Sequence, residues 1–261
     1  MLHTLMPGAT GRSRYVAMRN LEVAKRTWSG LITGIFEPFF YLLSVGVGVS
    51  VLVGDIVVDG RTYDYTAFVA PAMMASAAMS AAIAETTYNT YGKLKWDKTY
   101  EGMTATPLTP SDVAMGELIF AQARGTFYSA IFLLAMVSLG LVESWWALLA
   151  LPAAMLIGVA FAAAGLAAVT FMRSWEDFDL VLLVQISLFL FSATFYPLSV
   201  YPPAIQTVAR ISPLYHGASL CRDLILGTPG WSAVAHVAVL VVMVVVCLRL
   251  AGRRFAILLH A

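Results

Sequence analysis

Charged residues are scarce in this sequence. Only 12% of its 261 residues are Asp, Glu, Lys or Arg, whereas 60% are hydrophobic. A soluble domain is about one-quarter charged, and one soluble core of this length cannot enclose so much apolar surface. A lipid bilayer can accommodate it, because lipid solvates the apolar outer face of each spanning helix. The composition therefore excludes an ordinary soluble domain and predicts an integral membrane protein.

An excess of either charge is also absent, since the formal net charge is +1 at pH 7. No nucleic-acid partner is therefore expected. Cysteine is rare as well, and Cys221 and Cys247 lie far apart without the spacing of metal ligands. The four histidines are too scattered along the sequence to predict a metal site. We expect no bound metal.

The motifs of common catalytic sites are missing. The sequence has no G-x-x-x-x-G-K-[ST] phosphate-binding loop, no H-E-x-x-H and no G-x-S-x-G. We therefore expect no catalytic residues and no ATP-hydrolysing site in this chain. A competing interpretation is a membrane enzyme acting on lipid-linked substrates, with Glu176, Asp177 and Asp179 as interfacial acids. Three acids without a basic or histidine partner are more typical of a solvated helix N-terminus.

Long apolar runs are what the sequence does contain. A membrane-spanning helix requires about 20 mostly apolar residues. Six runs qualify, at residues 31–53, 66–87, 118–142, 147–171, 180–198 and 233–252. They do not alternate apolar with polar residues, so they predict an all-α protein with six transmembrane helices rather than a barrel. The single transmembrane domain, residues 1–261, divides into an interface helix (1–30), spans one to five (31–198), an outer hairpin (199–232), and span six with its tail (233–261).

The distribution of Lys and Arg orients the spans. The two termini and the segments after spans two and four carry twelve of these residues, whereas the other side carries only Arg61, Arg210 and Arg222. Basic residues accumulate on the cytoplasmic side of membrane proteins. We therefore predict a multi-pass protein of the cytoplasmic (inner) membrane with both termini in the cytoplasm, as an even number of spans also requires.

Residues 15–28 mix apolar side chains with Arg19, Glu22, Lys25 and Arg26. This amphipathic pattern predicts an N-terminal helix that lies along the cytoplasmic membrane surface with its basic face outward. The alternative is a cytoplasmic extension of the first span.

Residues 88–117 form a cytoplasmic segment much longer than a connection between two helices requires. Pro107 and Pro110 are expected to end a short helix near Ala105. Charged side chains alternate there with aromatic and aliphatic ones, which favours a docking helix with an apolar anchor and a charged rim. The alternative is a helix held on the membrane surface by its lysines and aromatic rings. The candidate docking residues are Trp96, Tyr100, Glu101, Gly102, Thr106, Pro107 and Leu108.

Residues 199–231 form a second long connection, on the outer side. Pro197, Pro202 and Pro203 prevent a straight helix from running through its start. We expect short helices after Pro203 and Pro213 that enter the outer leaflet and return, as a re-entrant helical hairpin between spans five and six. Non-helical backbone at that depth requires cover by protein or water. A shaped outer segment argues against a purely structural membrane scaffold.

Three charged residues lie within or beside the predicted spans, where a charge at the bilayer centre costs about 2.5–3.5 kcal/mol. Glu85 and Arg124 both lie near cytoplasmic ends and are expected to pair with each other or with lipid headgroups. Glu37 lies near the start of the first span. It is either a paired residue at the interface or a polar residue lining a transport pathway, and the sequence leaves both interpretations open.

Two segments resemble one known family. Residues 100–118, YEGMTATPLTPSDVAMGEL, resemble the cytoplasmic segment of type-two ABC exporter permeases, in which a Glu-Gly pair precedes a Thr-Pro-Leu turn. Residues 195–227 resemble the outer signature of that family, and their Pro-Leu-Tyr-His variant is most similar to nodulation-factor lipo-oligosaccharide and daunorubicin-type drug exporter permeases. The matching positions are Glu101, Gly102, Thr106, Pro107 and Leu108 in the first segment, and Pro197, Leu198, Pro202, Pro213, Leu214, His216 and Arg222 in the second.

The resemblance implies a permease subunit that exports an amphipathic drug, lipid or glycolipid and has no ATPase domain of its own. It implies two separately encoded ABC ATPase (nucleotide-binding) subunits, which would bind ATP and Mg, while this chain would bind no cofactor. It also implies a second permease copy in a homodimer, or a homologous permease, within membrane lipid. The ATPases would push on the N-terminal helix and on residues 88–108. The outer prolines and Arg222 would shape the outer segment rather than contact substrate.

We predict that a cysteine placed at Asp59 or Thr228 reacts with a membrane-impermeant maleimide in intact cells. A cysteine at Lys95 should react only after the cells are opened, because the side rich in Lys and Arg faces the cytoplasm. A gel shift after labelling measures this, and labelling of each variant in opened cells is the control. Labelling of position 95 in intact cells would reverse the topology.

Overall fold

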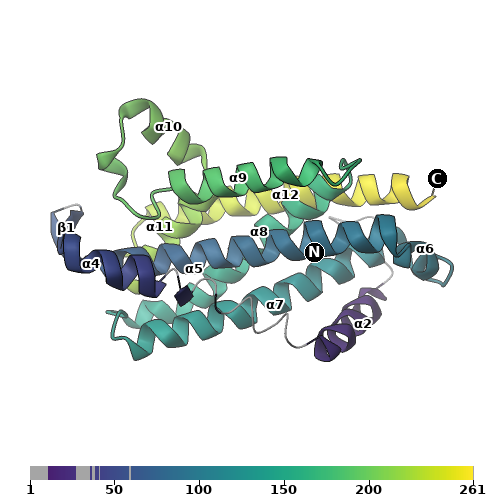
Figure 1. Cartoon of the computed structure of the whole chain (residues 1–261), viewed down its shortest axis with the longest axis horizontal. Helices are drawn as coiled ribbons and strands as arrows, with labels where there is room; N and C mark the ends of the chain where they lie inside the picture. The colour runs from purple at the N-terminus through teal and green to yellow at the C-terminus, as the bar shows by residue number, and fades with distance from the viewer. Residues whose placement is uncertain (1–10, 28–35, 37–38, 41, 59, 261) are drawn as a thin grey trace.

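The computed structural model describes residues 11–27, 36, 39–40, 42–58 and 60–260. Its elements are α2 (Ser13–Arg26), η1 (Leu42–Val47), α4 (Gly48–Val53), β1 (Asp55–Val58), β2 (Arg61–Asp64), α5 (Tyr65–Ala84), η2 (Glu85–Asn89), η3 (Gly92–Trp96), α6 (Thr99–Thr104), α7 (Pro110–Ser138), η4 (Trp145–Leu149), α8 (Ala150–Val169), α9 (Asp177–Phe191), η5 (Leu198–Val200), α10 (Pro203–Ile211), α11 (Pro213–Ile225) and α12 (Ser232–His260). The long helices run side by side along one axis (Figure 1). We name the two ends of this bundle the α6 end, which also holds α2, and the α10 end, which also holds the strands.

Among the described residues, four helical stretches are long and apolar enough to cross a membrane, namely Tyr65–Trp96, Pro110–Ser138, Trp145–Val169 and Ser232–Leu259. They correspond to the second, third, fourth and sixth predicted spans, which confirms a membrane protein built from apolar helices. In the described part of the first predicted span, Leu42–Val53 is a shorter apolar helix. The 15 residues of α9 extend about 22 Å, less than the roughly 30 Å of a bilayer core. The six-span arrangement therefore remains a prediction.

The fifth predicted span is shifted along the sequence. The apolar run predicts residues 180–198, whereas α9 begins at Asp177 and ends at Phe191. Beyond this end, Ala193 adopts a positive φ of 54°, and the hydroxyl oxygens of Ser192 and Ser212 lie 2.6 Å apart. The contact between Ser192 and the distant Ser212 thus stabilises the turn after α9. The helix therefore ends before Pro197, near which it was expected to stop.

The second predicted span continues beyond its expected end at residue 87. The helix passes from α5 through the π-helical turns η2 and η3 to Trp96. Polar residues do not end it, because the hydroxyls of Thr86 and Thr87 donate hydrogen bonds of 2.7 and 2.6 Å to carbonyl oxygens one turn back. These turns are the π-type insertions that often mark functional positions in helices.

The third predicted span begins earlier than expected. The first turn of α7 is fixed by a capping box, in which the Thr109 hydroxyl accepts from the Asp112 backbone and the Asp112 carboxylate accepts from the Thr109 backbone. The predicted connection of residues 88–117 therefore shrinks to residues 97–109. Within it, α6 ends with Ala105 as its C-cap, which confirms the short helix predicted there.

The N-terminal amphipathic helix is present as α2, and it packs against α7. Val16 and Asn20 are buried in this contact, whereas Tyr15 and Met18 are exposed. Close approach is possible because position 116 of α7 is glycine, and a Cβ there would collide with Val16. The helix thus has one face on the protein and one mixed apolar and basic face outside.

Small residues allow the central helices to pack closely. The Ala-rich helix α8 contacts α5, α7, α11 and α12. Gly165 of α8 faces the second span so closely that a Cβ there would collide with Thr86. Helices in membranes associate through such small residues, since lipid supplies no hydrophobic force between them.

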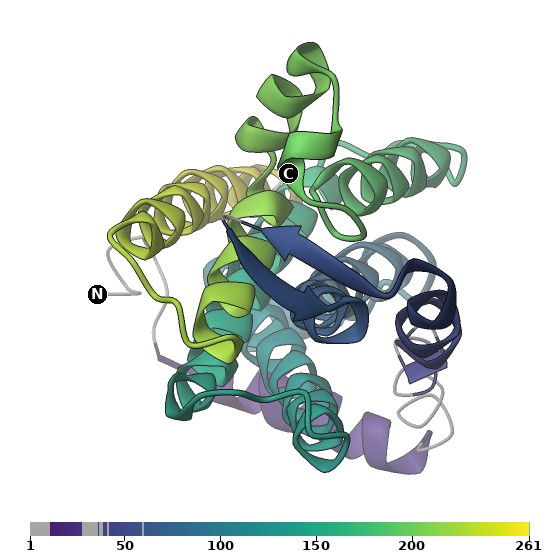
Figure 2. The ribbon, with the colours of Figure 1, turned by 90° about the vertical axis from the view of Figure 1, so that its left-hand side faces the viewer.

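The α10 end is closed by the hairpin of β1 and β2 and by the outer helices. The strands pair antiparallel with Asp55 opposite Asp64, and the Asp64 carboxylate caps α5 by accepting from the Thr66 and Ala67 amides. In Figure 2 the hairpin lies across the end of the bundle, while α10 stands out at its edge. The predicted helix starts at Pro203 and Pro213 are confirmed. Entry of these helices into the membrane remains a prediction.

We predict that Gly116→Ala displaces α2 from α7. A Cβ at this position would lie 2.8 Å from the Ser13 carbonyl oxygen and would also collide with Val16, so one helix must move. Amide hydrogen exchange in α2 should therefore become faster. Gly125→Ala in the same helix is the control, because its Cβ would meet no described atom within 4 Å. Equal exchange in the two variants would contradict this packing.

Candidate functional site

The predicted docking residues divide into buried and exposed groups. Tyr100 is fully buried, with 0% of its surface exposed, and its ring centre lies 6.3 Å from that of Phe255 in α12. Burial, and then the nearby Glu117 carboxylate, raises the pKa of the Tyr100 hydroxyl well above its usual value. The expectation that this side chain faces a partner is therefore corrected, because Tyr100 and the buried Met103 anchor α6 to the bundle.

Four of the predicted docking residues, in α6 and the turn after it, are exposed, and we name them the exposed α6 face: Glu101, Gly102, Thr106 and Pro107. Leu108 follows them and is half-buried against the core. The backbone of this face is held from both sides. The Thr106 hydroxyl donates to the Met103 carbonyl oxygen at 2.6 Å, and Arg12, just before α2, donates to the Pro107 carbonyl oxygen at 2.6 Å. The face is thus solvent-accessible but rigidly supported.

Trp96 belongs to an aromatic cluster beside this face. It is 63% exposed, and its ring stacks on Trp175 with 5.1 Å between centres. Trp175 precedes α9 and packs on Phe178, whose ring stacks in turn on Tyr88 at 4.3 Å. The cluster therefore ties the end of the second span to the start of α9. Sequence reasoning missed Trp175, although a tryptophan in a short polar turn between two helices was a signal for it.

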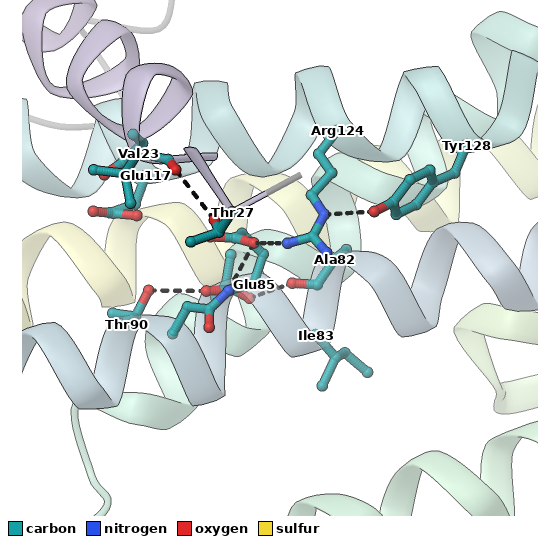
Figure 3. Close-up of polar contacts among 12 residues, drawn as sticks. Val23, Thr27, Ala82, Ile83, Glu85, Thr90, Glu117, Arg124 and Tyr128 are labelled. Atoms are coloured by element: carbon teal, nitrogen blue, oxygen red, sulfur yellow. Dashed lines mark hydrogen bonds and ion pairs between the residues drawn. The ribbon is translucent and has the colours of Figure 1, made fainter. Parts of the chain in front are cut away.

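A network of four charged residues lies beneath α6. Arg124 donates from Nη1 to Oε2 of Glu85 at 2.7 Å, and the Glu85 side chain is only 3% exposed. Arg124 also donates from Nε to the Tyr128 hydroxyl at 2.9 Å. Figure 3 shows these contacts between the second and third spans. The predicted pairing of Glu85 with Arg124 is confirmed.

Lys93 joins the two carboxylates of the network. Its Nζ lies 2.7 Å from Oε2 of Glu117, whose side chain is fully buried, and 4.0 Å from Oε1 of Glu85. It also donates to Oδ1 of Asn20 in α2 at 3.3 Å. Two acids are thus balanced by two bases, which is how charges are tolerated in a low-dielectric interior. The network connects α2 and α7 with the second span, of which η3 is the last part.

The outer signature residues lie at the α10 end and do not meet the exposed α6 face. Pro197 and Leu198 begin the short turn η5, Pro202 is the N-cap of α10, and Pro213 occupies the first turn of α11. The prolines thus fix helix starts. His216 extends from α11 to α12, where its Nδ1 lies 2.8 Å from Nδ1 of His236.

Arg222 holds α11 to the rest of the bundle. Its Nε donates to the Phe68 carbonyl oxygen at 3.1 Å, and its Nη2 donates to the Ala193 carbonyl oxygen at 2.9 Å. The guanidinium lies 3.8 Å from the centre of the Phe68 ring. These contacts attach α11 to α5 and to the turn after α9. The role of Arg222 in shaping the outer segment rather than contacting substrate stays a prediction.

Two further expectations concern acids. Glu37 lies outside the described residues. Asp177, one of the acids considered for a membrane enzyme, accepts hydrogen bonds from the backbone amides of Arg173 and Ser174 at 2.7 and 3.2 Å. It therefore closes the turn at the start of α9. In the described ranges, no three His, Cys, Asp or Glu side chains gather closely enough to hold a metal ion.

Comparison with known proteins identifies the family of this bundle of apolar helices. Residues 13–226 match the ABC-2 type transporter family. The chain therefore belongs to this family, as its two motifs predicted, and it is a transport permease rather than an enzyme. Membership implies association with ABC ATPase subunits, in which ATP hydrolysis takes place.

Several relatives cover most of the chain. Nodulation protein J of Rhizobium leguminosarum bv. trifolii is 32% identical over 93% of this chain and 92% of its own length. Nodulation protein J of Rhizobium leguminosarum bv. viciae is 33% identical over 91% of this chain and 89% of its own. The inner membrane transport permease YadH of Escherichia coli K12 is 27% identical over 74% and 76%.

We predict that Arg124→Leu lowers the free energy of unfolding by about 3–5 kcal/mol, because it leaves the buried Glu85 carboxylate without its closest partner. Thermal unfolding of the purified protein measures the change. Lys25→Leu is the control, since the Lys25–Glu22 pair has the same length of 2.7 Å but is exposed, and such pairs contribute little. Equal unfolding of the two variants would show that the buried pair is not stabilising.

Proposed function

We propose that this chain is the transmembrane subunit of an ATP-driven exporter that moves an amphipathic substrate outward across the cytoplasmic membrane. Family membership and the motifs of residues 100–118 support this function. Two separately encoded ABC ATPases would bind ATP and Mg, and a second permease, either a copy of this chain or a homologue, would complete the complex. A drug, lipid or glycolipid substrate agrees with the resemblance to lipo-oligosaccharide and drug exporter permeases.

The observation that carries this proposal is the support beneath the exposed α6 face. The face carries Glu101 and Gly102 in water, while Tyr100 on the opposite side of the same helix is buried against α12. A partner that pushes on the face would therefore move the bundle rather than bend a loop. The exposed rings of Trp96 and Trp175 extend the contact surface toward α9.

The topology of the complex follows from the same assignment. We place the α6 end in the cytoplasm, with α2, α6 and the end of α12, and the α10 end outside. The apolar helices Leu42–Val53 and α9 would complete six spans, together with neighbouring residues. Helices α10 and α11 would form the outer re-entrant hairpin past which substrate leaves. Glu37 would line the pathway or pair at the interface.

We predict that Glu101→Lys releases the ATPase from the purified permease. A lysine on the exposed α6 face would disrupt a charged contact with the partner, and like charges brought together at an interface cost several kcal/mol, or about a hundredfold in affinity. Co-purification of a tagged permease measures retention of the ATPase. Gly102→Pro should have the same effect, because proline removes the amide that donates to the Lys98 carbonyl oxygen.

Two controls separate docking from folding and from net charge. Gly102→Ala adds a Cβ that meets no described atom within 4 Å, so it should retain the ATPase. Arg253→Glu reverses an exposed charge on α12 at the same end and should retain it too. A Glu101→Lys protein that still binds a coupled ATPase would instead favour a helix that lies on the membrane surface.

A further inference from the structure

Two histidines that are distant in the sequence meet at the α10 end. His216 lies near the start of α11, and His236 lies near the start of α12. Their Nδ1 atoms are 2.8 Å apart and their ring centres are 5.0 Å apart. These distances fit a direct hydrogen bond between the two imidazole rings. The side chain of His236 is 9% exposed, so the bond is largely shielded from water.

This contact limits how many protons the two rings can hold. A hydrogen bond between two Nδ1 atoms needs a hydrogen on one nitrogen and a lone pair on the other. An imidazolium ring carries a hydrogen on both of its nitrogens. Two imidazolium rings would therefore bring two N–H groups and two positive charges together at 2.8 Å. The bonded pair holds at most one imidazolium, whereas two separated histidines can each take up a proton.

The groups that surround the pair do not favour a second positive charge. Tyr215 lies against both rings, with ring centres 5.5 Å from His216 and 6.1 Å from His236, and its phenol is neutral at physiological pH. Arg210, at the end of α10, lies against His216 through its backbone and carries a positive charge itself. A second proton would therefore enter a largely buried place that already has a cation beside it.

The carboxylates at this end lie away from the pair. Helix α8, which packs on both α11 and α12, has no titratable side chain. In the described helices packed around the pair, the other titratable residues at this end are Tyr65 of α5, Glu143 beside η4, and Cys221, Arg222 and Asp223 of α11. The amide of Glu143 donates to the Ile225 carbonyl oxygen at the far end of α11. Asp223 is about 10 Å along α11 from His216.

Three polar side-chain contacts attach α11 to the rest of the bundle in the described part of the chain. The hydroxyls of Ser212 and Ser192 connect its start to the turn after α9. Arg222 connects its other end to α5 and to the same turn. Serine does not titrate and arginine keeps its charge, whereas histidine ordinarily titrates near pH 6.5. Of the three attachments, the histidine contact with α12 is thus the one that a change in pH can break.

We propose that the pair of His216 and His236 is a proton-operated latch, which acid at the α10 end opens by separating α11 from α12. The open state binds up to one proton more than the closed state. Each pH unit below about 6.5 therefore favours opening by up to about tenfold, and above that pH the hydrogen bond keeps the latch closed. The proposed function places this end outside the cell and the substrate exit beside α11. The role of the latch in export rests on that function.

The test measures amide hydrogen exchange of α11 in the full-length permease with its ATPase, in phosphatidylcholine nanodiscs. His236→Asn keeps a donor and an acceptor near the position of Nδ1 but does not titrate, so its latch should stay closed in acid. The exchange chemistry itself changes equally with pH in both proteins, so the ratio of their rates reports opening. We expect equal rates at about pH 7.5, and exchange at least about tenfold faster in the unmodified protein at about pH 5.

A second variant tests whether the hydrogen bond holds the two helices together. His236→Leu removes the bond, so α11 should exchange faster than in the unmodified protein at about pH 7.5. Exchange of α2, at the other end of the bundle, should be the same in all three proteins and verifies that the fold is intact. Equal exchange of the unmodified protein and His236→Asn at about pH 5 would overturn the latch. Slow exchange of His236→Leu at about pH 7.5 would overturn it too.

A further measurement separates the latch from the export function. In proteoliposomes with the ATPase outward, the α10 end faces the lumen, whose pH is set independently. Lumenal acid should raise ATP hydrolysis by the unmodified complex relative to His236→Asn, because α11 separates more easily from α12. An unchanged ratio would overturn the role of the latch in export. If no ATPase is retained by the permease, the proposed function fails instead, and exchange in the permease alone still decides whether the latch exists.

Discussion

The buried carboxylate of Glu85 is the constraint on which the α6 end of this permease depends. A charge in an apolar bundle must meet an opposite charge, and Arg124 meets it at 2.7 Å. This pairing determines which sides of the second and third spans lie against each other. It also explains why the second span does not end where its sequence becomes polar. The helix continues because Glu85 and Lys93 are paired within the network, while the hydroxyls of Thr86 and Thr87 donate to carbonyl oxygens one turn back. The π-helical turn at Glu85–Asn89 begins at the paired carboxylate. Lys93 then brings Glu117 and α2 into the same arrangement.

At the α10 end a guanidinium is stabilised by backbone carbonyl oxygens. The guanidinium of Arg222 donates to the carbonyl oxygens of Phe68 and Ala193 while lying over an aromatic ring. The carbonyl of Ala193 is available because the chain turns there with a positive φ. The prolines set where α10 and α11 begin, and Arg222 sets how they attach to the bundle. The two ends therefore differ in kind, since one carries a buried ionic network and the other a backbone clamp.

The sequence predicted apolar helices well because burial in lipid depends on composition over about 20 residues. It predicted their ends poorly, because polar residues such as Thr86 and Thr87 indicate a loop unless their partners are known. The sequence contains the Thr109 and Asp112 of the capping box, but residues 88–117 were interpreted as one long connection, so the helix start at Pro110 was not predicted. Tyr100 was assigned to a partner because the pattern of a short helix does not show which side faces inward. Trp175 and the His216–His236 contact depend on residues that only the fold brings together.

A continuous set of side-chain contacts connects α6 with Arg124, which lines two adjoining cavities. Tyr100 is buried beside Glu117, whose carboxylate contributes to the raised pKa of its hydroxyl. Glu117 holds Lys93, which also faces Glu85. Glu85 in turn holds Arg124. If an ATPase shifts α6, every member of this set must keep its charge paired, because an unpaired buried charge is costly. Movement of α6 would therefore reposition Arg124 and change how the second and third spans are held together.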